Sequence, residues 1–535
     1  MKLFCKNNKL YLIFKYDEEI ITQVKELPAA KWDKEVKAWT FPATTVCYEN
    51  IKEKFGIKID ELEGNFKLSI KNFEFKVKPY DHQFEAVKFA LDNFLKYKGL
   101  NKGIAFLAEM GVGKSYMAIS TVEILYINKL INNVLVISPL SIIDTWQEQL
   151  EKFCSYSIWD SLVGNKSKRL ESLDRTYNYS KKFLNWCIIN IDGISVIQEE
   201  LKKKKFDLVI IDESTSIKNR QAQRTKLVTE LFSDTPYKII MSGNPIPKSA
   251  DEIFSQYKFL DAGVFGSYYY SFIDRYCEVD YFNKVTELKN EQEFHSKMHS
   301  IAFRKTKQEC LSLPPKIYEK EFIEMTPEQK QIYKTMEKDA IASYKDKTCA
   351  ATVVITKFLR LSQIAGGFFP DNEGGGEYIQ PNKKLERLVE IISELPKIEQ
   401  FVVWARFRKE IEIIEKALKE NNISCVTFYG ETSYKDKGIA RELFREKKVR
   451  GFIGNPSSGG KGLNDLIGAT TVIYYSNDYS AENRIQSEDR NHRNGTIKVL
   501  YIDLIMKDTI DIIVLNTVRQ NLDFANALLS KTLVL

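Results

Sequence analysis

A glycine-rich turn between an apolar strand and a helix constrains the fold of this chain more than any other feature. The apolar run 103–107 leads through Ala108 into five residues with phosphate-binding chemistry: Gly111, Val112, Gly113, Lys114 and Ser115. Glycines let backbone N–H groups approach phosphate oxygens, and the following helix directs the positive end of its dipole at them. Lys114 can reach the outer phosphates, and the Ser115 hydroxyl can ligate Mg²⁺. The pattern predicts a triphosphate site; a turn without a ligand is the alternative, because Ala108 replaces the first glycine of the common motif.

An apolar segment that ends in two acids supplies the second half of such a site. Residues 208–211 read Leu-Val-Ile-Ile, and Asp212 and Glu213 follow directly. A buried parallel strand of this kind ends at the sheet edge where α/β proteins bind ligands. We expect Asp212 to hold Mg²⁺ through its water shell and Glu213 to orient and deprotonate an attacking water. A strand ending in two solvated acids is the plainer alternative, but its combination with the glycine turn favours a nucleotide hydrolase that uses ATP and Mg²⁺.

Composition narrows the class of protein. A chain of 535 residues is too long for one hydrophobic core and favours about three domains. Basic residues exceed acidic ones by 79 − 72 = 7, which is compatible with a nucleic-acid partner. The eight cysteines form no Cys-x-x-Cys pair and the four histidines lack metal-ligand spacing, so we expect reduced thiols and no zinc site. The absence of a secretory signal and of a membrane-length apolar run favours the cytoplasm. The mid-sized, lysine-rich chain suits a bacterium or a phage-infected host.

Two series of apolar strands that alternate with amphipathic helices organise the chain. The expected strands are 104–108, 134–138, 186–191, 208–212 and 238–242 in the first series, and 400–405, 425–429, 451–455, 471–475 and 499–504 in the second. This alternation is typical of parallel sheets wrapped by helices. The stretch 370–382, rich in glycine and proline, is the best candidate for a linker or loop. We expect domains at 1–74, 75–320 and 321–535, with a ligand-binding cleft between two similar lobes.

A basic segment in the second series could act on a triphosphate held by the first. Arg490 and Arg493 lie three residues apart within 486–495, so on a helix both would face one way. Arginines that reach a γ-phosphate across a cleft stabilise transition-state charge, typically by ~10³–10⁵ in rate. An amphipathic helix with an exposed basic face is an equal alternative when this segment is considered alone.

The chain from Pro79 to Leu515 resembles the Swi/Snf-type helicase-like ATPases of helicase superfamily 2, because it contains the motifs of that family in the same order. The motifs that carry the resemblance are Tyr80–Gln83, Ala108–Ser115, Val136–Trp146, Asp212–Asn219, Met241–Ile246, Phe401–Ala405, Asn455–Asn464 and Gln486–Gly495. The resemblance implies an α/β fold of two RecA-like, doubly wound parallel-sheet lobes with helical insertions, preceded by a small α+β module. It also implies that Gln83 reads the adenine of ATP and that Arg490 and Arg493 act as arginine fingers, which contact the γ-phosphate. Double-stranded or forked DNA is the partner that the resemblance implies.

The same resemblance assigns contacts with nucleic acid. Groups suited to phosphate oxygens are expected at Ser138, Pro139, Thr145, Lys218, Asn219, Ser457 and Lys461. Two sites depart from the family, which usually has Ala-His where Ser214 and Thr215 stand and Thr-Gly-Thr-Pro where residues 242–245 read Ser-Gly-Asn-Pro. Both sites are thought to link hydrolysis to nucleic-acid contact in this family. Hydroxyl and amide groups can still form such a link, although stimulation by DNA could be weaker.

The first 74 residues resemble a different module. Trp32, Trp39 and Phe41 stand in a pattern similar to the substrate-recognition module (HARP) of annealing helicases, and residues 359–368 are similar to the annealing-helicase and phage-type branch. Exposed rings beside lysines could stack on unpaired bases, each worth ~1–3 kcal/mol. We expect instead that at least two of these three rings form the core of the module.

Three functions remain open from the sequence. The first is an ATP-dependent DNA translocase of the annealing-helicase type, which remodels forked or branched DNA. The second is a strand-separating helicase on DNA or RNA, which unwinding of a short tailed duplex would reveal. The third is an ATP-gated clamp that holds DNA while barely turning over, which a hydrolysis rate unresponsive to nucleic acid would favour.

Overall fold

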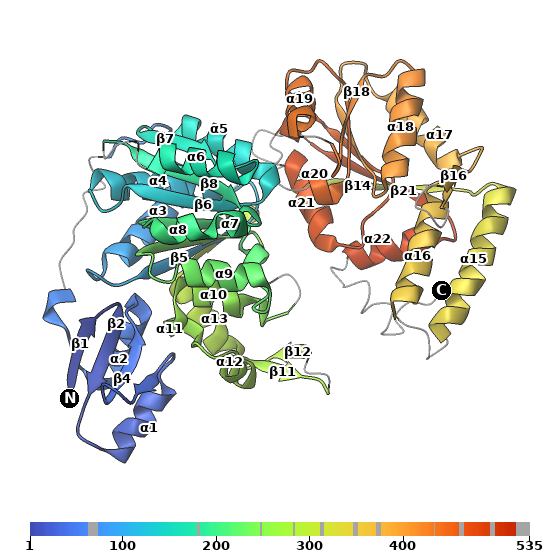
Figure 1. Cartoon of the computed structure of the whole chain (residues 1–535). Helices are drawn as coiled ribbons and strands as arrows, with labels where there is room; N and C mark the ends of the chain where they lie inside the picture. The colour runs from blue at the N-terminus through green and yellow to red at the C-terminus, as the bar shows by residue number, and fades with distance from the viewer. Residues whose placement is uncertain are drawn as a thin grey trace. The chain divides into compact units, whose positions relative to one another are not determined.

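The structure is a computed structural model that describes residues 1–62, 73–177, 179, 182–246, 249–281, 284–310, 315–345, 351–370, 376–432, 434–459, 465–492 and 498–519. The chain divides into two compact units, 1–311 and 312–535, whose elements are labelled in Figure 1. The first unit contains both the N-terminal residues and the first strand–helix series. The sequence suggested a boundary at residue 321, whereas the division of the structure falls after residue 311. The earlier division follows because β14 (Ile317–Ile323) pairs with the sheet of the second unit.

An antiparallel sheet and two helices form the N-terminal module, as expected for an α+β unit. The sheet order is β1 (Lys2–Lys6), β2 (Lys9–Ile13), β4 (Ala38–Pro42) and β3 (Lys31–Asp33). The side chains of Asp17 and Thr44 accept backbone N–H bonds and so cap α1 (Glu18–Glu26) and α2 (Thr45–Phe55). Phe41 is buried and Trp39 packs half-buried against the same core, as expected, whereas Trp32 is 49% exposed.

Hydrogen bonds and a shared core attach this module to the rest of the first unit. Asp261, the residue after α10 (Glu252–Leu260), accepts bonds from the Thr44 hydroxyl at 2.6 Å and from the Val46 backbone N–H at 3.1 Å. Tyr97 and Leu100, which lie beyond the module in the sequence, are buried in its hydrophobic core. Burial raises the pKa of Asp261 to about 6, although these hydrogen bonds favour the ionised form.

Seven parallel strands form the central sheet of the first unit. Their order is β13 (Ala302–Lys305), β5 (Lys102–Ala108), β10 (Tyr237–Met241), β9 (Leu208–Asp212), β6 (Asn133–Ser138), β8 (Leu184–Asn190) and β7 (Ser157–Ser161). The five expected strands are confirmed. The edge strands β7 and β13 were not expected, because they contain polar residues and lack the continuous apolar run of a central strand.

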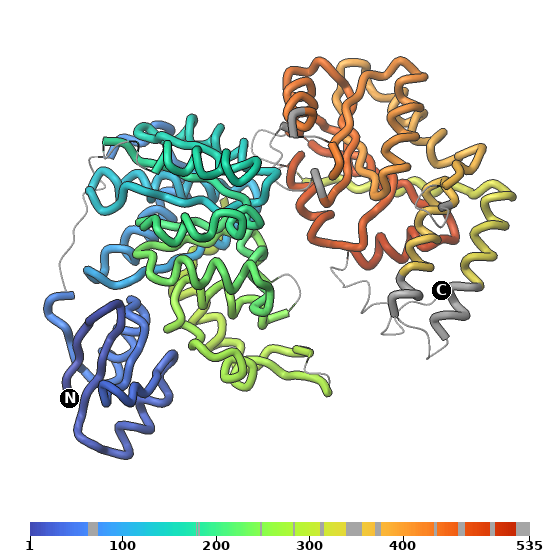
Figure 2. The backbone as a smooth tube through the Cα atoms, in the orientation of Figure 1, coloured from blue at the N-terminus to red at the C-terminus, as the bar shows by residue number. Residues whose placement is uncertain are grey.

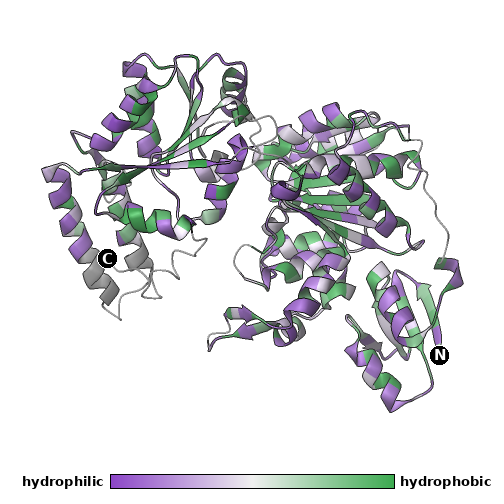
Figure 3. Cartoon of the chain, turned by 180° about the vertical axis from the view of Figure 1, so that it is seen from behind, coloured by the Kyte–Doolittle hydropathy of each residue, from purple (hydrophilic) through white to green (hydrophobic). Residues whose placement is uncertain are grey.

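Helices cover both faces of this sheet, and alternate strand residues enter two cores. Along β5, Ala105 and Leu107 belong to one core and Ile104 and Phe106 to the other. The helices that contribute to these cores include α3 (Asp81–Leu95), α4 (Lys114–Ile127), α5 (Ile143–Phe153), α6 (Lys166–Tyr177), α7 (Gly193–Val196), α8 (Gln198–Lys203), α9 (Gln223–Leu231) and α10. In Figure 3 the strands of this sheet are largely hydrophobic, and the covering helices carry hydrophilic residues.

An aromatic group of helices follows the sheet strands of the first unit. It contains α11 (Ala262–Phe265), α12 (Tyr269–Tyr276) and α13 (Glu291–Ser300), followed in the chain by α14 (Lys307–Cys310). The rings of Phe265, Phe272 and Phe294 pack against one another with centroids 5.2–6.3 Å apart. The hairpin of β11 (Cys277–Val279) and β12 (Val285–Leu288) projects from these helices (Figure 2). This part of the unit is therefore mainly helical, and aromatic rings form much of its core.

Six parallel strands form the central sheet of the second unit. Their order is β14, β21 (Leu500–Met506), β20 (Thr471–Tyr474), β17 (Phe401–Trp404), β19 (Gly451–Gly454) and β18 (Cys425–Phe428). The helices of the unit are α15 (Pro327–Lys345), α16 (Ala351–Ala365), α17 (Lys383–Glu394), α18 (Arg408–Glu420), α19 (Tyr434–Arg445), α20 (Pro456–Gly459), α21 (Ala481–Asn491) and α22 (Ile510–Arg519). The two-lobed α/β fold predicted from the sequence is confirmed, and so are the five expected strands. Among the six described strands of this sheet, the charged edge strand β14 was not expected.

The glycine-rich stretch 370–382 does not join the two units. It lies within the second unit, where β15 (Phe368–Pro370) pairs antiparallel with β16 (Gly376–Tyr378). Asn382 then caps α17 by accepting the backbone N–H of Leu385. Of the two predicted alternatives, a linker or a loop, the described residues of this stretch agree with a loop, because α15 and α16 already belong to the second unit.

Candidate nucleotide-binding site

The glycine-rich loop has the geometry that its sequence predicts. β5 ends at Ala108, and α4 begins at Lys114. Gly111 and Gly113 adopt φ values of +86° and +99°, which only glycine adopts readily. The ammonium group of Lys114 donates to the backbone carbonyl of Ala108 at 2.8 Å and so folds back over the loop. The strand–loop–helix arrangement and the helix N-terminus after the loop are confirmed, and backbone amides of such a loop suit phosphate oxygens.

Gln83 lies against this loop. Its amide oxygen accepts the backbone N–H of Tyr80 at 3.0 Å, and its amide nitrogen donates to the carbonyl of Val112 at 3.3 Å. A methyl group on Gly113 would stand 2.2 Å from the same nitrogen, so the loop and the glutamine fit closely. Val112 is buried and Ser115 half-buried. The placement of Gln83 beside the loop agrees with a nucleotide-related role, while its contact with adenine stays a prediction.

The two acids lie at the same sheet edge as the loop. Met241 of β10 pairs with Phe106 on one side and with Asp212 on the other, so β5 and β9 end at nearly the same level. Burial and the neighbouring Glu213 raise the pKa of Asp212, and the nearby charge of Lys114 opposes this rise. A half-buried hydroxyl and a buried carboxylate at one site are oxygen donors of the kind that Mg²⁺ takes, so Ser115 and Asp212 fit the ion.

Glu213 has an unusual backbone conformation. Its φ and ψ are +52° and +64°, the left-handed region that a glutamate rarely adopts. Conformations of this kind cost roughly 1–3 kcal/mol and persist where the surrounding structure holds them, often at active sites. Here Asp212 helps to hold the turn, because its carboxylate accepts the backbone N–H of Glu213 at 3.0 Å.

The structure adds two residues whose contacts the sequence did not reveal. The indole N–H of Trp146 donates to the Asp212 carboxylate at 2.9 Å. The fully buried Gln256 of α10 accepts the hydroxyl of Ser214 at 2.6 Å and donates to the carbonyl of Pro245 at 2.7 Å. Ser214 and Pro245 belong to the two motifs that depart from the family pattern, so a hydrogen-bonded link between them exists. Trp146 is the last residue of the motif Val136–Trp146, whereas no sequence signal marks Gln256.

The residues expected to touch nucleic acid on the first unit differ in exposure. Ser138 and Thr145 are buried, and Pro139 is half-buried. The exposed residues of this loop are Leu140 and Ser141. Contacts of Ser138 and Thr145 with a strand therefore require backbone groups or movement of the loop, and these two assignments stay predictions.

The second expected contact segment lies next to α10. Asn219 is exposed, while Lys218 is half-buried and forms an ion pair with Glu252 at 2.8 Å. The hydroxyl of Ser255 donates to the carbonyls of Ile217 and Lys218 at 2.7 Å and anchors the segment. A phosphate that binds Lys218 therefore competes with the carboxylate of Glu252.

The predicted residues of the second unit are partly described. Ser457 is exposed, and its backbone N–H donates to the Asn455 side chain at 2.9 Å. Arg490 lies in the last turn of α21 and is only 2% exposed. That helix ends at Asn491, and the expectation that Arg490 and Arg493 share one helical face stays a prediction. Two predicted residues lie outside the described part of the chain: Lys461 and Arg493.

Buried ion pairs hold the helix that carries Arg490. Arg484 pairs with Glu488 one turn later and with Asp503 on β21. Glu488 also accepts hydrogen bonds from Lys316 and from the hydroxyl of Tyr318 on β14. Breaking such a network leaves an unpaired buried charge, so α21 is firmly fixed to the sheet of the second unit.

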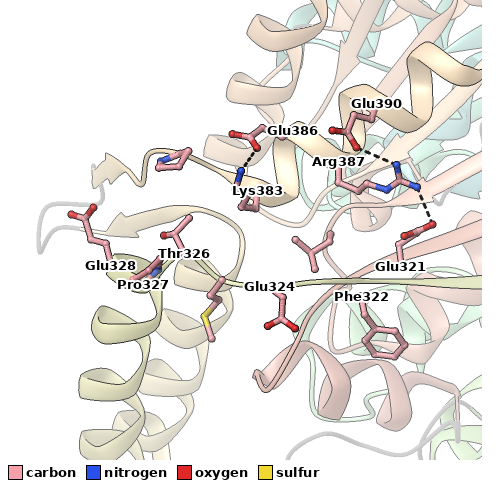
Figure 4. A pocket seen from close by; sticks show the side chains of 13 residues that line it. Glu321, Phe322, Glu324, Thr326, Pro327, Glu328, Lys383, Glu386, Arg387 and Glu390 are labelled. Carbon is pink, nitrogen blue, oxygen red and sulfur yellow. Dashed lines mark hydrogen bonds and ion pairs between the residues drawn. The ribbon is translucent and has the colours of Figure 1, made fainter.

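A pocket in the second unit lies between β14 and α17 and is drawn in Figure 4. Its basic side chains already have acidic partners. Lys383 pairs with Glu386, and the guanidinium of Arg387 points between Glu321 and Glu390 (Figure 4). A triphosphate needs positive charge that is not neutralised, so this pocket does not resemble a nucleotide site.

The seven cysteines in the described part of the chain are free thiols. Among the described residues, no group of three or more His, Cys, Asp and Glu side chains could hold a metal ion. None of the helices in the described ranges is long and apolar enough to cross a membrane.

A glycine-rich loop at a parallel-sheet edge, beside a strand that ends in Asp-Glu, defines an α/β nucleotide-binding protein. Residues 82–365 match the SNF2-related domain, and residues 383–495 match the helicase conserved C-terminal domain. Because the first match alone covers more than half of the chain, the protein belongs to the SNF2-related domain family.

Three proteins that are similar to this chain agree with membership of this family. The chain is 24% identical to a Danio rerio "Chromodomain-helicase-DNA-binding protein 1-like", over 76% of this chain and 40% of the relative. It is 26% identical to an "Uncharacterized ATP-dependent helicase" of Mycoplasma pneumoniae, over 91% and 46%. It is 22% identical to a Caenorhabditis elegans "SWI/SNF-related matrix-associated actin-dependent regulator of chromatin subfamily A-like protein 1 homolog", over 95% and 73%. The chain thus spans less than half the length of the first two relatives.

One solved structure is similar along most of the chain. It is titled "Sulfolobus solfataricus SWI2/SNF2 ATPase core in complex with dsDNA" and shares 24% identity. The similarity covers 85% of this chain and 93% of that one, with a TM-score of 0.41.

Proposed function

We propose that this protein is a DNA-dependent ATPase that moves along DNA. The observation that carries the proposal is the meeting of the glycine-rich loop with Asp212 and Glu213 at one edge of the first sheet, in a chain of the SNF2-related domain family. Each half of this arrangement alone occurs in many strands and turns. Together they provide phosphate binding, a metal-holding carboxylate and a candidate general base at one place.

The chain's own residues divide the work of hydrolysis. The backbone amides around Gly111 and Gly113 and the ammonium group of Lys114 hold the phosphates of ATP. Ser115 and Asp212 hold Mg²⁺, which supplies positive charge that neutralises the phosphate oxygens when it is bound. Glu213, half-buried at the strand end, orients the attacking water and accepts its proton.

Arginines of the second unit complete the site in this proposal. Arg490 and Arg493 approach the γ-phosphate when the units close on ATP and withdraw after hydrolysis. The fixed position of α21 in its unit supports such a role, because a finger must arrive in a defined orientation. Repeated closure and opening, with each unit holding DNA in turn through Ser138, Pro139, Thr145, Lys218, Asn219, Ser457 and Lys461, produce movement along a strand.

The link through Gln256 favours a motor over an ATP-gated clamp. A clamp would need no connection between the carboxylate motif, residues 212–219, and the coupling loop, residues 242–245. The hydrogen bonds from Ser214 to Gln256 and from Gln256 to Pro245 supply that connection despite the departures from the family pattern. Hydrolysis is therefore expected to respond to nucleic acid.

A basic and aromatic surface supports forked or branched DNA as the finer substrate. It joins the N-terminal module to α12, since the ammonium of Lys31 lies 5.5 Å from the ring of Tyr268 and the guanidinium of Arg220 lies 3.8 Å from that of Tyr269. Burial and the charges of Lys31 and Arg220 lower the pKa of Lys258. The exposed rings on this surface are Trp32, Tyr268 and Tyr270. Cations beside exposed rings are the chemistry that binds unpaired strands.

Steady-state ATP hydrolysis tests the proposal. Rates are compared without nucleic acid and with duplex DNA, single-stranded DNA, forked DNA and RNA, using Glu213→Gln as the inactive reference. Stimulation by duplex or forked DNA that is absent in the reference supports the translocase. Equal rates in all conditions contradict it and favour the clamp. Displacement of a third strand from a triplex without opening of a short duplex then separates a translocase from a strand-separating helicase.

A substitution tests the forked-DNA preference separately. Trp32→Ala is expected to raise the half-saturating concentration of forked DNA about 5–160-fold, the equivalent of one lost stacking contact of ~1–3 kcal/mol, with a smaller change for duplex DNA. Tyr16→Ala serves as the matched control, because Tyr16 is another exposed ring of the module. Equal effects of the two variants would exclude the surface around Trp32 as a recognition site.

A further inference from the structure

We propose that Trp146 is a positioning residue that connects the loop at 138–145 to the carboxylate of Asp212. The proposal rests on the proposed function, since it concerns how nucleic-acid contact reaches the site of hydrolysis. Trp146 is proposed to contact neither the phosphates of ATP nor the DNA. It acts through Asp212.

The contact between the two residues is buried and directional. Trp146 is 1% exposed and Asp212 is 8% exposed. The indole N–H donates to one carboxylate oxygen at 2.9 Å, and the backbone N–H of Glu213 donates to the other at 3.0 Å. Two donors on the two oxygens fix the plane of the carboxylate. Each oxygen keeps a further lone pair, so the group can still accept from the water shell of Mg²⁺.

Trp146 lies in the first turn of the helix that the loop leads into. The loop's exposed residues, Leu140 and Ser141, belong to a single 3₁₀ turn (Leu140–Ile142), and α5 follows at Ile143 without a break. Ile143 and Leu150 of the same helix are buried in the core behind the sheet. A strand that displaces the turn therefore moves the start of α5, and the indole moves with it. Hydrogen bonds weaken steeply with misalignment, so small shifts alter the hold on Asp212.

The chain contains a matched control for this contact. Trp186 of β8 is fully buried in the same core, with its ring centroid 6.5 Å from that of Trp146. Its indole nitrogen is buried and has no hydrogen-bond partner among the described residues. Trp146→Phe and Trp186→Phe thus remove the same atoms from one core, but only the first removes a hydrogen bond to Asp212.

The decisive experiment measures binding of a fluorescent ATP analogue to the full chain as Mg²⁺ is titrated, in the wild type and both variants. Removal of a hydrogen-bond partner of a metal-holding group typically costs about 10–100-fold in metal affinity, so the Mg²⁺ midpoint of Trp146→Phe is expected to rise by that factor. The midpoint of Trp186→Phe is expected to stay within about twofold of the wild type. An unchanged midpoint in Trp146→Phe, or equal shifts in the two variants, overturns the proposal.

Stimulation of hydrolysis by DNA provides the second half of the test. Trp146→Phe is expected to lose most of the stimulation that the wild type shows, and Trp186→Phe to retain it. Full stimulation in Trp146→Phe overturns the connection to the loop. A wild type that no nucleic acid stimulates contradicts the proposed function instead, and it leaves the Mg²⁺ midpoints as an independent test of the Trp146–Asp212 contact.

A measurement on the wild type covers the case in which Trp146→Phe does not fold. Labelling the indole nitrogens with ¹⁵N gives one signal for each of the six tryptophans, and Trp→Phe changes at the other five positions assign that of Trp146 by elimination. Duplex DNA added without nucleotide is expected to shift the Trp146 signal and leave that of Trp186 in place. No shift at Trp146 on saturation with DNA overturns the proposal.

Discussion

Replacement of Gln256 by leucine tests the link between the carboxylate motif and the coupling loop. The side chain is fully buried, and leucine has a similar size without the amide. The change removes the two linking bonds, from the Ser214 hydroxyl at 2.6 Å and to the Pro245 carbonyl at 2.7 Å, and also a bond to the Glu252 carbonyl at 2.9 Å within α10. It also leaves the buried hydroxyl of Ser214 and the carbonyl of Pro245 without these partners. Because the loss acts on two motifs at once, both stability and coupling are expected to fall.

The magnitude follows from the two hydrogen bonds. A neutral buried hydrogen bond contributes about 0.5–1.5 kcal/mol net, and a buried polar group left without a partner costs about 1–3 kcal/mol. Gln256→Leu is therefore expected to lower the free energy of unfolding of the first unit by roughly 2–4 kcal/mol. Ser214→Ala loses one of the two bonds and leaves a single acceptor without a donor, so a drop of roughly 1–2 kcal/mol is expected.

Two assays separate stability from coupling. Chemical denaturation of the wild type, the two single variants and the double variant gives the interaction energy of the pair, expected to be about 1 kcal/mol for residues in direct contact. ATP hydrolysis with and without duplex DNA gives the stimulation ratio, which is expected to fall in Gln256→Leu more than in Ser214→Ala. If the stimulation ratio of Gln256→Leu equals that of the wild type while its stability drops, the link has only a structural role and the reasoning fails.

Three further outcomes are expected. Gly113→Ala places a methyl group 2.2 Å from the Gln83 amide at a φ of +99°, so binding of an ATP analogue should fall more than about 10-fold while the unit still melts cooperatively; normal binding would contradict the loop assignment. Glu252→Gln removes the ion-pair partner of Lys218 and should tighten duplex DNA at low salt by about 2–5-fold, with equal affinity counting against Lys218 as a phosphate contact. Asp261, with its pKa raised to about 6, binds its proton more tightly in the folded than in the unfolded chain, so its contribution to stability is greatest below pH 4 and falls between pH 4 and 6. The stability advantage of the wild type over Asp261→Asn should shrink by up to about 3 kcal/mol across that window, and a constant difference would refute the raised pKa.

Most strands of the two sheets could be predicted because a central parallel strand is recognisable from its own short sequence. Both faces of β8 and β9 are buried, so their sequences are largely apolar and can be recognised as central strands. The edge strands β7, β13 and β14 are partly exposed and carry polar residues, so their sequences look like loops. Missing β14 also shifted the expected boundary between the units, because that strand belongs to the second sheet.

The site divides along the same lines. The sequence by itself determined the phosphate loop, whose glycines and Lys114 act within a few residues of one another, and the pair Asp212 and Glu213 at a strand end. It did not reveal that Trp146 holds Asp212, or that Gln256 connects Ser214 with Pro245, because these partners stand 66 and 42 residues apart. A motif made of neighbouring residues can be recognised in the sequence. Contacts between distant residues exist only after the sheet register and helix packing bring their side chains together. For the same reason only the tertiary structure decided that Asp261 attaches the N-terminal module to the first unit, across 217 residues from Thr44.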